Sequence, residues 1–105
     1  MSLDDAMMQK PCFDPPVEHN LKCWPVFFEA IRLGDKKFEF RKNDRRFMVG
    51  HTLLLREWEP DEALYTGRWI RAKVTYMLSG KSALVHGIDP DYCVMSIDVV
   101  ASDAD

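Results

Sequence analysis

The chain has 105 residues, of which 47% are hydrophobic and 30% charged, and its formal net charge is −3 with a pI near 5.6. This length and composition are typical of one globular domain with a core of its own, and they exclude wholesale disorder. No apolar run approaches the roughly 20 residues that span a bilayer, and the N-terminus has no signal-peptide pattern. We therefore expect a cytoplasmic protein without membrane contact.

The cysteines and histidines give no sign of a cofactor. Cys12, Cys23 and Cys93 are odd in number and far apart, which argues against a disulfide framework or a zinc knuckle and favours a reducing compartment. The three histidines are His19, His51 and His86, and they show no metal-ligand spacing. We expect each histidine to be structural or exposed, and we expect no metal or other cofactor.

Composition divides the chain into three parts. Residues 1–16 mix prolines, methionines and acids without a usable period, which predicts a flexible N-terminal arm. Residues 17–100 carry the periodic segments of a single domain, and residues 101–105 form an acidic tail that we expect to be frayed. There is no internal repeat, and nothing in the sequence indicates a particular oligomeric state.

The first predicted elements are a short strand at 19–23 and a helix at 25–33. Pro25 suits the first turn of that helix, and Gly34 suits its C-terminal cap, where a positive φ is needed. The helical period places Phe27 and Ile31 on the face that packs against the core, and Phe28 widens that face.

A strand at 37–42 follows, and its side chains alternate in character. We expect Phe38 and Phe40 to be buried, with Lys37, Glu39 and Arg41 displayed on the other face. A strand that displays an acid between two bases can be a ligand platform. An ordinary edge strand with solvated charges explains the same pattern equally well.

The rest of the chain reads as strands joined by loops. We predict loops at 42–46, 57–65 and 79–91, a turn at 49–51, and strands at 52–58, 68–78 and 92–100. On the last two strands the inward residues are predicted to be Ile70, Ala72, Val74, Tyr76, Leu78, Cys93, Met95, Ile97 and Val99. One helix followed by several strands indicates a mixed α/β (α+β) domain, a small closed or half-closed β-barrel with a flanking N-terminal helix.

Positive charge is concentrated in one segment. Residues 32–46 contain seven of the fourteen Lys and Arg residues and only three acids, which leaves +4 in a chain whose net charge is −3. Such polarisation attracts an anion, and a phosphodiester backbone is the commonest large one.

The same segment carries a family resemblance. Gly34, Lys36, Glu39 and Arg41 spell G-x-K-x-x-E-x-R, which resembles the signature of ASCH domains, a branch of the PUA-like barrel superfamily. Residues 19–98 as a whole are similar to a subgroup of small ASCH-like proteins of unknown function from bacteria and phages. The resemblance implies a PUA-like β-barrel with a cleft that takes RNA or a modified nucleoside.

From these observations we predict an RNA-binding or other nucleic-acid-binding module. Lys36 and Arg41 would engage phosphate or a base edge, and Glu39 would pair with Arg41 or accept from a base amino group. The predicted binding surface comprises Lys36, Lys37, Glu39, Arg41, Lys42, Arg45 and Arg46. Candidates for base stacking are Trp24, Trp58, Trp69 and Tyr65, although aromatic residues in so small a domain are more often core.

Two other classes of function stay open. Some ASCH relatives are amidohydrolases or ribonucleases, and the amidohydrolases use a threonine three positions after the motif lysine and a glutamate far downstream. Here Glu39 stands in the threonine position and no glutamate follows Glu62, so a hydrolase acting on modified nucleosides or RNA would have to use Lys36 and Glu39. A protein-interaction adaptor is the third class.

Two further patterns do not support the function that they first suggest. Gly80-Lys81-Ser82 lacks the upstream glycine of a phosphate-binding loop, because Thr75 stands there. Cys23 and Cys93 lack a histidine partner motif for nucleophilic catalysis.

Overall fold

Five strands form one sheet in the computed structural model, which describes residues 17–103. In chain order they are β1 (Glu18–Cys23), β2 (Phe38–Lys42), β3 (Thr52–Glu59), β4 (Leu64–Ser79) and β5 (Tyr92–Ser102). The order across the sheet is β1-β3-β4-β5-β2, in which β1 pairs with β3 in parallel and all other pairs are antiparallel. The predicted arm at 1–16 and residues 104–105 lie outside the described residues.

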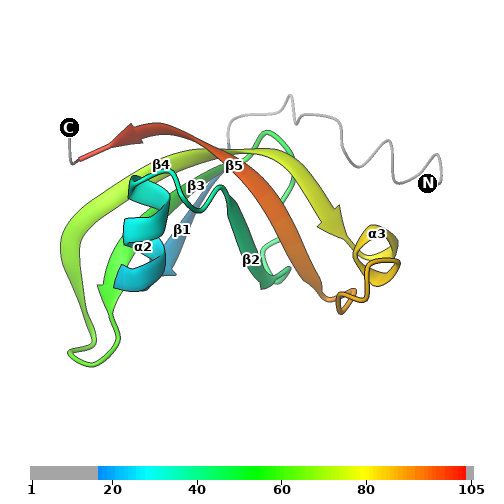
Figure 1. Cartoon of the computed structure of the whole chain (residues 1–105), viewed down its shortest axis with the longest axis horizontal. Helices are drawn as coiled ribbons and strands as arrows, with labels where there is room; N and C mark the ends of the chain where they lie inside the picture. Colours follow the sequence, from blue (N-terminus) through cyan, green and yellow to red (C-terminus); the bar gives the residue numbers. More distant parts are fainter. Residues whose placement is uncertain (1–16, 104–105) are drawn as a thin grey trace.

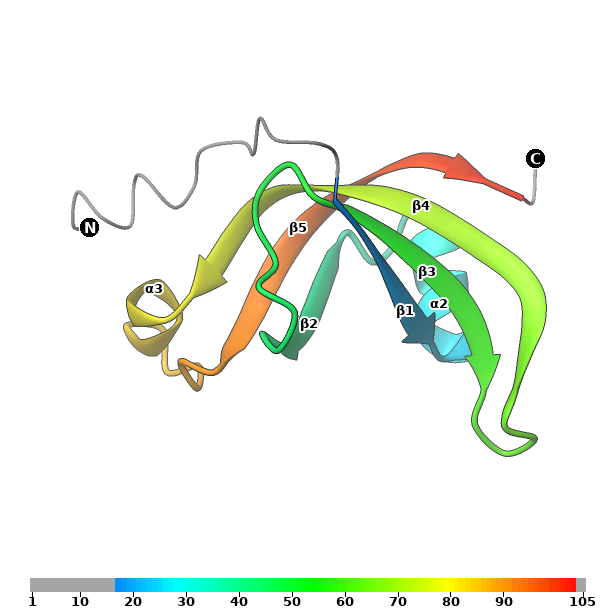
Figure 2. The same cartoon turned by 180° about the vertical axis from the view of Figure 1, so that it is seen from behind.

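The sheet is strongly curled. Figure 1 shows β4 and β5 as an arch with helix α2 (Pro25–Arg32) beneath its concave side, and Figure 2 shows β1 and β3 from the opposite side. A short helix, α3 (Lys81–Leu84), lies beyond the end of β4, inside the segment predicted to be only a loop. The prediction of a small α+β domain with a half-closed barrel is confirmed.

Helix α2 begins and ends as its sequence predicts. Pro25 occupies the first turn after Trp24, whose backbone is extended, and Gly34 follows the helix with a φ of 83°. Phe28 and Ile31 enter the core, with 0% and 2% of their surface exposed. The prediction for Phe27 is wrong, because this side chain is 47% exposed. The eight-residue helix covers the opening of the curl with one narrow stripe, and Phe27 lies beside that stripe.

The core fills the concave side of the sheet. Alternate residues of four strands point into it, and they include Leu21, Cys23, Leu53, Leu55, Ile70, Ala72, Val74, Cys93, Met95 and Ile97.

Sheet irregularities overturn three of the predicted inward positions. The β4–β5 register shifts between Val74 and Tyr76, which turns Tyr76 outward and brings Met77 into the core, so Leu78 is only half-buried. The register of the same two strands shifts again between Arg71 and Ala72. Val99, which was predicted to point inward, lies beside this second shift and is 50% exposed.

Several predicted boundaries also move. The predicted loop at 57–65 shrinks to a tight connection, because β3 runs to Glu59 and β4 starts at Leu64. The strand β5 continues to Ser102, so residues 101–102 belong to the sheet and not to a tail.

The buried and exposed faces of β2 are the reverse of the prediction. Glu39 is 3% exposed, whereas Phe38 and Phe40 are 46% and 51% exposed. The alternation itself is as predicted, but the charged face turns inward because Glu39 and Arg41 find polar partners there. Phe40 contacts Tyr92 on the outside, with ring centroids 5.7 Å apart.

Candidate functional site

The outer edges of β1 and β2, the two ends of the curled sheet, face each other across a gap that we call the seam. The Thr52 amide donates to the Val17 carbonyl (2.9 Å), so by alternation the carbonyls of Asn20 and Lys22 point away from β3. The Ile97 amide donates to the Lys37 carbonyl (3.0 Å), which likewise turns the main-chain groups of Phe38 and Phe40 away from β5. Both free edges therefore border the seam.

Two arginines bridge the seam. Arg41 donates from Nη2 to the Lys22 carbonyl (2.6 Å), and Arg45 donates from Nη1 to the Asn20 carbonyl (2.9 Å). Within the described residues, β1 and β2 share no backbone pairing. Side chains therefore take the place of a ladder, and they leave an opening beside them.

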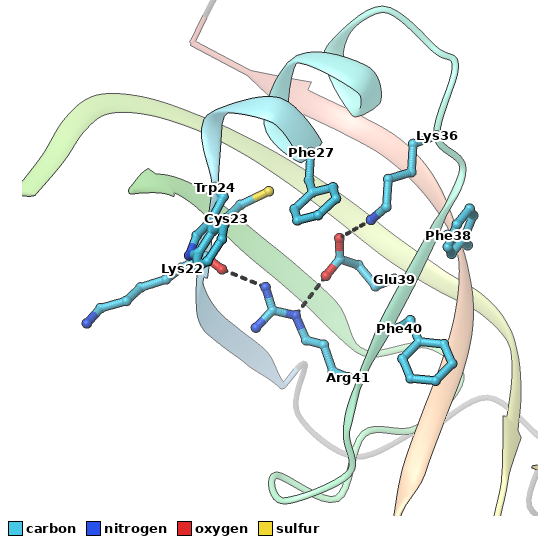
Figure 3. A pocket seen from close by; sticks show the side chains of 9 residues that line it. All are labelled: Lys22, Cys23, Trp24, Phe27, Lys36, Phe38, Glu39, Phe40 and Arg41. Carbon is cyan, nitrogen blue, oxygen red and sulfur yellow. Dashed lines mark hydrogen bonds and ion pairs between the residues drawn. The ribbon is translucent and has the colours of Figure 1, made fainter. Parts of the chain in front are cut away.

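A cavity of about 450 Å³ occupies this opening. Its lining comes from two short stretches of chain, the end of β1 with the start of α2, and the turn into β2 with β2 itself. The residues are Lys22, Cys23, Trp24 and Phe27 from the first stretch and Lys36, Phe38, Glu39, Phe40 and Arg41 from the second. Figure 3 shows Glu39 and Arg41 directed toward α2, with the Phe38 and Phe40 rings on the other side of β2.

Glu39 lies at the centre of the lining, between two cations. The Lys36 ammonium donates to Oε1 (2.9 Å) and Arg41 Nε donates to Oε2 (2.7 Å), as the dashed lines in Figure 3 mark. Only 4% of the Glu39 side chain is exposed, against 17% for Lys36 and 26% for Arg41. Such charge-assisted bonds are strong, and these three side chains together carry one net positive charge.

Aromatic side chains form the mouth of the cavity. Trp24 is 52% exposed and Phe27 is 47% exposed, although both line it. The Lys36 ammonium lies 5.4 Å from the centroid of the Phe27 ring and 4.9 Å from that of Phe38. The mouth can therefore stack a planar ring, and the floor offers charged hydrogen-bonding groups.

The thiol in the cavity is not an activated nucleophile. Burial first, and then the Glu39 carboxylate, raise the pKa of Cys23 to about 12. Cys23 is therefore a neutral thiol at physiological pH. Because only the thiolate is nucleophilic, this thiol is unreactive.

The structure divides the predicted site residues into groups. Lys36, Glu39, Arg41 and Trp24 all line the cavity. Lys37 lines a separate cavity of about 290 Å³ beside Ile97. Lys42 and Arg46 are exposed outside both linings, and Arg45 bridges the seam.

The other predicted stacking residues lie outside the cavity. Trp58 and Tyr65 contact each other edge to face at 4.8 Å, and the Lys22 ammonium lies 4.0 Å from the Trp58 centroid. Trp69 has the Arg71 guanidinium 5.3 Å from its centroid. Tyr65 has the Arg56 guanidinium 3.8 Å from its centroid, so each of these three aromatic residues already has a cation as a partner.

The sequence did not single out Lys22, Cys23 or Phe27 as site residues. The available signal was local, since Trp24-Pro25 marks the point at which a strand gives way to a helix. Nothing in the sequence indicated that this junction lies next to β2.

A second buried carboxylate, Glu57, is satisfied within the sheet. Thr66 donates to Glu57 Oε1 (2.7 Å), and Arg68 Nη1 lies 3.7 Å away.

Within residues 17–103, no group of three or more His, Cys, Asp and Glu side chains is placed to hold a metal ion. None of the described helices is long and apolar enough to cross a membrane.

Comparison with known proteins identifies a family and a phage relative. The model of a domain of unknown function, DUF3850, matches residues 18–97. An uncharacterized 12.9 kDa protein in the GpA 3' region of Escherichia phage P2 is 39% identical over 57 residues. That alignment covers 54% of this chain and 50% of the phage protein, so the chain spans about half the length of this relative.

Proposed function

We propose that the chain, which belongs to the DUF3850 family, binds single-stranded RNA or a modified nucleotide with one base seated in the cavity at the seam. The observation that carries this proposal is the buried Glu39 carboxylate, held between Lys36 and Arg41 on the floor of a cavity with an aromatic mouth. We further propose that the family is an ASCH-like branch of the PUA-like barrels, which the G-x-K-x-x-E-x-R motif and the half-barrel sheet support.

The size and chemistry of the cavity support a nucleobase as the ligand. Its volume of about 450 Å³ lies within the range of small-molecule pockets. Proteins that read single strands stack unpaired bases on aromatic side chains and hydrogen-bond their edges. Trp24 and Phe27 supply the first kind of contact, and Lys36, Glu39 and Arg41 supply the second.

The hydrogen bonds support different proposed tasks for the basic residues. Arg41 and Arg45 donate to protein groups, so we do not count them among the main phosphate contacts. Lys37, Lys42 and Arg46 are exposed in the same basic segment and are suited to phosphates. Because such contacts are few, we expect weak to moderate affinity.

A titration with short RNA and DNA oligonucleotides at two salt concentrations tests the proposal. The log of the affinity should fall with log salt with a slope of roughly −0.7 per phosphate neutralised on single strands. Lys36→Ala should weaken binding by about 1–3 kcal/mol. Lys73→Ala is the matched control, because Lys73 is exposed on β4 and lies outside both cavity linings. No binding at low salt, or binding that Lys36→Ala and Arg41→Ala together leave unchanged, would overturn the proposal.

One observation favours a second candidate, a hydrolase acting on modified nucleosides. The Lys36 amine and the Glu39 carboxylate, 2.9 Å apart, both line the cavity, where they would face a bound nucleoside. The threonine and the downstream glutamate of the amidohydrolases are missing, so we expect no appreciable turnover of N4-acetylcytidine. Release of acetate that disappears in Lys36→Ala would promote this candidate over simple binding.

A further inference from the structure

The floor of the cavity presents three polar groups in a fixed order. The Lys36 ammonium, the Glu39 carboxylate and the Arg41 guanidinium follow one another, joined by hydrogen bonds of 2.9 and 2.7 Å. Toward a ligand this order is donor, acceptor, donor, because ammonium and guanidinium groups only donate and a carboxylate only accepts.

Each of the three groups has hydrogen-bonding capacity left. An ammonium has three N–H donors, and the hydrogen bond to Glu39 uses one of those of Lys36. A guanidinium has five, and Arg41 directs Nε to Glu39 and one Nη2 hydrogen to the Lys22 carbonyl. A carboxylate offers about four lone-pair sites, of which Glu39 uses two for these cations. By this count of donors and acceptors, a base edge can be added without breaking the existing network.

The base edges of RNA differ in how well they match this order. Uracil presents O2, N3–H and O4, which is acceptor, donor, acceptor and complements all three groups. Cytosine presents two adjacent acceptors and an amino group, so its ring nitrogen N3 would meet the carboxylate, acceptor against acceptor. Adenine has the same fault at N1, and guanine presents two adjacent donors that leave one cation without a partner.

We infer that the cavity selects uracil, with N3–H donating to Glu39 and the two carbonyl oxygens accepting from Lys36 and Arg41. The inference rests on the proposed function and names the base that the site takes. Selectivity against cytosine and adenine follows from burial, because Glu39 is 3% exposed and little water is left to separate its carboxylate from the ring-nitrogen acceptor of either base. The stacking contributed by Trp24 and Phe27 is common to all bases and leaves the choice to the floor.

The direct test compares RNA hexamers of uridine, cytidine and adenosine at one low salt concentration. The uridine hexamer should bind roughly 5- to 150-fold more tightly than the cytidine hexamer, the range expected for one well-matched base contact. Phosphate contacts are the same in the three hexamers, so the difference reports the base alone.

A second probe isolates the central hydrogen bond. Uridine and 3-methyluridine compete with a labelled uridine hexamer, and they differ only at N3, where a methyl group replaces the hydrogen of the donor. We expect uridine to compete and 3-methyluridine to fail. This comparison uses the unaltered protein and therefore does not depend on whether any variant folds.

Glu39→Gln tests the residue itself. The amide keeps the size of the side chain but cannot offer two acceptor oxygens, so the preference for uridine over cytidine should largely disappear. The thermal midpoint of the variant, measured alongside, separates loss of preference from loss of fold. Lys73→Ala should keep the full preference.

The outcomes are distinct for the two proposals. If no hexamer binds, the proposed function fails and the inference fails with it. If all hexamers bind equally, or 3-methyluridine competes as well as uridine, the choice of uracil is wrong while nucleic-acid binding stands.

Discussion

Glu39 has an unusual position for a charged side chain, because it is buried on an edge strand between two exposed phenylalanines. A buried charge is tolerated only when it is paired and hydrogen-bonded, and Glu39 meets both conditions through Lys36 and Arg41. Removing one partner of a buried ion pair typically lowers the free energy of unfolding by about 3–5 kcal/mol. We therefore treat Lys36, Glu39 and Arg41 as one interdependent network.

Cys23 allows a prediction at the scale of a single residue. Burial is the main cause that raises the pKa of Cys23 to about 12, and it also raises the pKa of Cys93 to about 11. We expect both thiols to resist iodoacetamide in the folded protein at about pH 8, because the thiolate is the reactive form. Peptide mass spectrometry of samples alkylated with and without denaturant measures this.

Unfolding serves as the positive control, since both cysteines should then react at the ordinary rate. Rapid labelling of Cys23 in the folded protein would mean that the cavity activates this thiol, and it would revive a nucleophilic role.

At this scale the sequence predicted the identity of the central residues but not their environment. The motif pointed to Lys36, Glu39 and Arg41, and all three line the cavity. Burial of Glu39 could not be predicted, because alternation along a strand fixes which residues share a face and leaves open which face turns inward. Phenylalanines are the usual choice for the inner face, and here tertiary hydrogen bonds decided otherwise.

At the scale of elements, β1 and β2 are held together by side chains. The carbonyls of Asn20 and Lys22 accept from Arg45 and Arg41, so each arginine satisfies a main-chain acceptor on the free edge of β1. The cavity exists because these bridges leave room where a paired strand would fill the gap.

Arg45 provides a test of this bridging that leaves the cavity lining intact. Arg45→Ala should lower the free energy of unfolding by about 1 kcal/mol, the usual size for one hydrogen bond at a partly solvated site. Urea denaturation followed by tryptophan fluorescence measures it. Lys42→Ala is the matched control, since Lys42 is equally basic, lies on β2 and is exposed. Equal destabilisation by the two variants would show that the bond to Asn20 contributes nothing.

The elements themselves were largely predictable, and their irregularities were not. Pro25 and Gly34 set the ends of α2 through backbone geometry that only those residues favour there. The irregularity in β4 between Val74 and Tyr76 depends on how β5 lies beside it, so an apolar alternation read along one strand misplaced Tyr76. The parallel pairing of β1 with β3 is likewise a long-range contact that no local pattern contains.

At the scale of the whole molecule, a histidine pair links β1 to the start of β3. His19 Nε2 lies 2.8 Å from His51 Nδ1, which also accepts from the Met48 amide (3.3 Å), so the proton between the two rings belongs to His19. Burial is the main cause that lowers the pKa of both rings, and for His19 the neighbouring His51 and Arg45 lower it further. The sequence predicted only structural or exposed histidines and gave no hint of the pairing.

This pair predicts that stability falls as the solution becomes acidic. A histidine pKa that is lower in the folded state than its ordinary value of 6.5 means that the unfolded chain binds more protons below that pH. The contribution of the two neutral histidines to the free energy of unfolding should therefore be fully present above pH 6.5. It should decrease as the pH falls through that value toward the folded pKa. Urea denaturation at about pH 7.5 and about pH 5.5 measures the difference.

Two variants assign the effect to the pair. His19→Gln should reduce the difference between the two pH values, while His86→Gln, which changes an exposed histidine beyond α3, should leave it unchanged. If the difference in stability between the two pH values keeps its full size in His19→Gln, carboxylates elsewhere cause it and the histidine pair does not.

The seam has a consequence for how the protein behaves at high concentration. A strand with free main-chain donors and acceptors recruits strands from other molecules, and this is a common route to aggregation. Here the free edges of β1 and β2 border the same gap, and arginine side chains cover two of the carbonyls on β1. Another chain would have to enter that gap to pair with either edge. The half-barrel thus has much of the protection of a closed barrel and still keeps an opening large enough for a ligand.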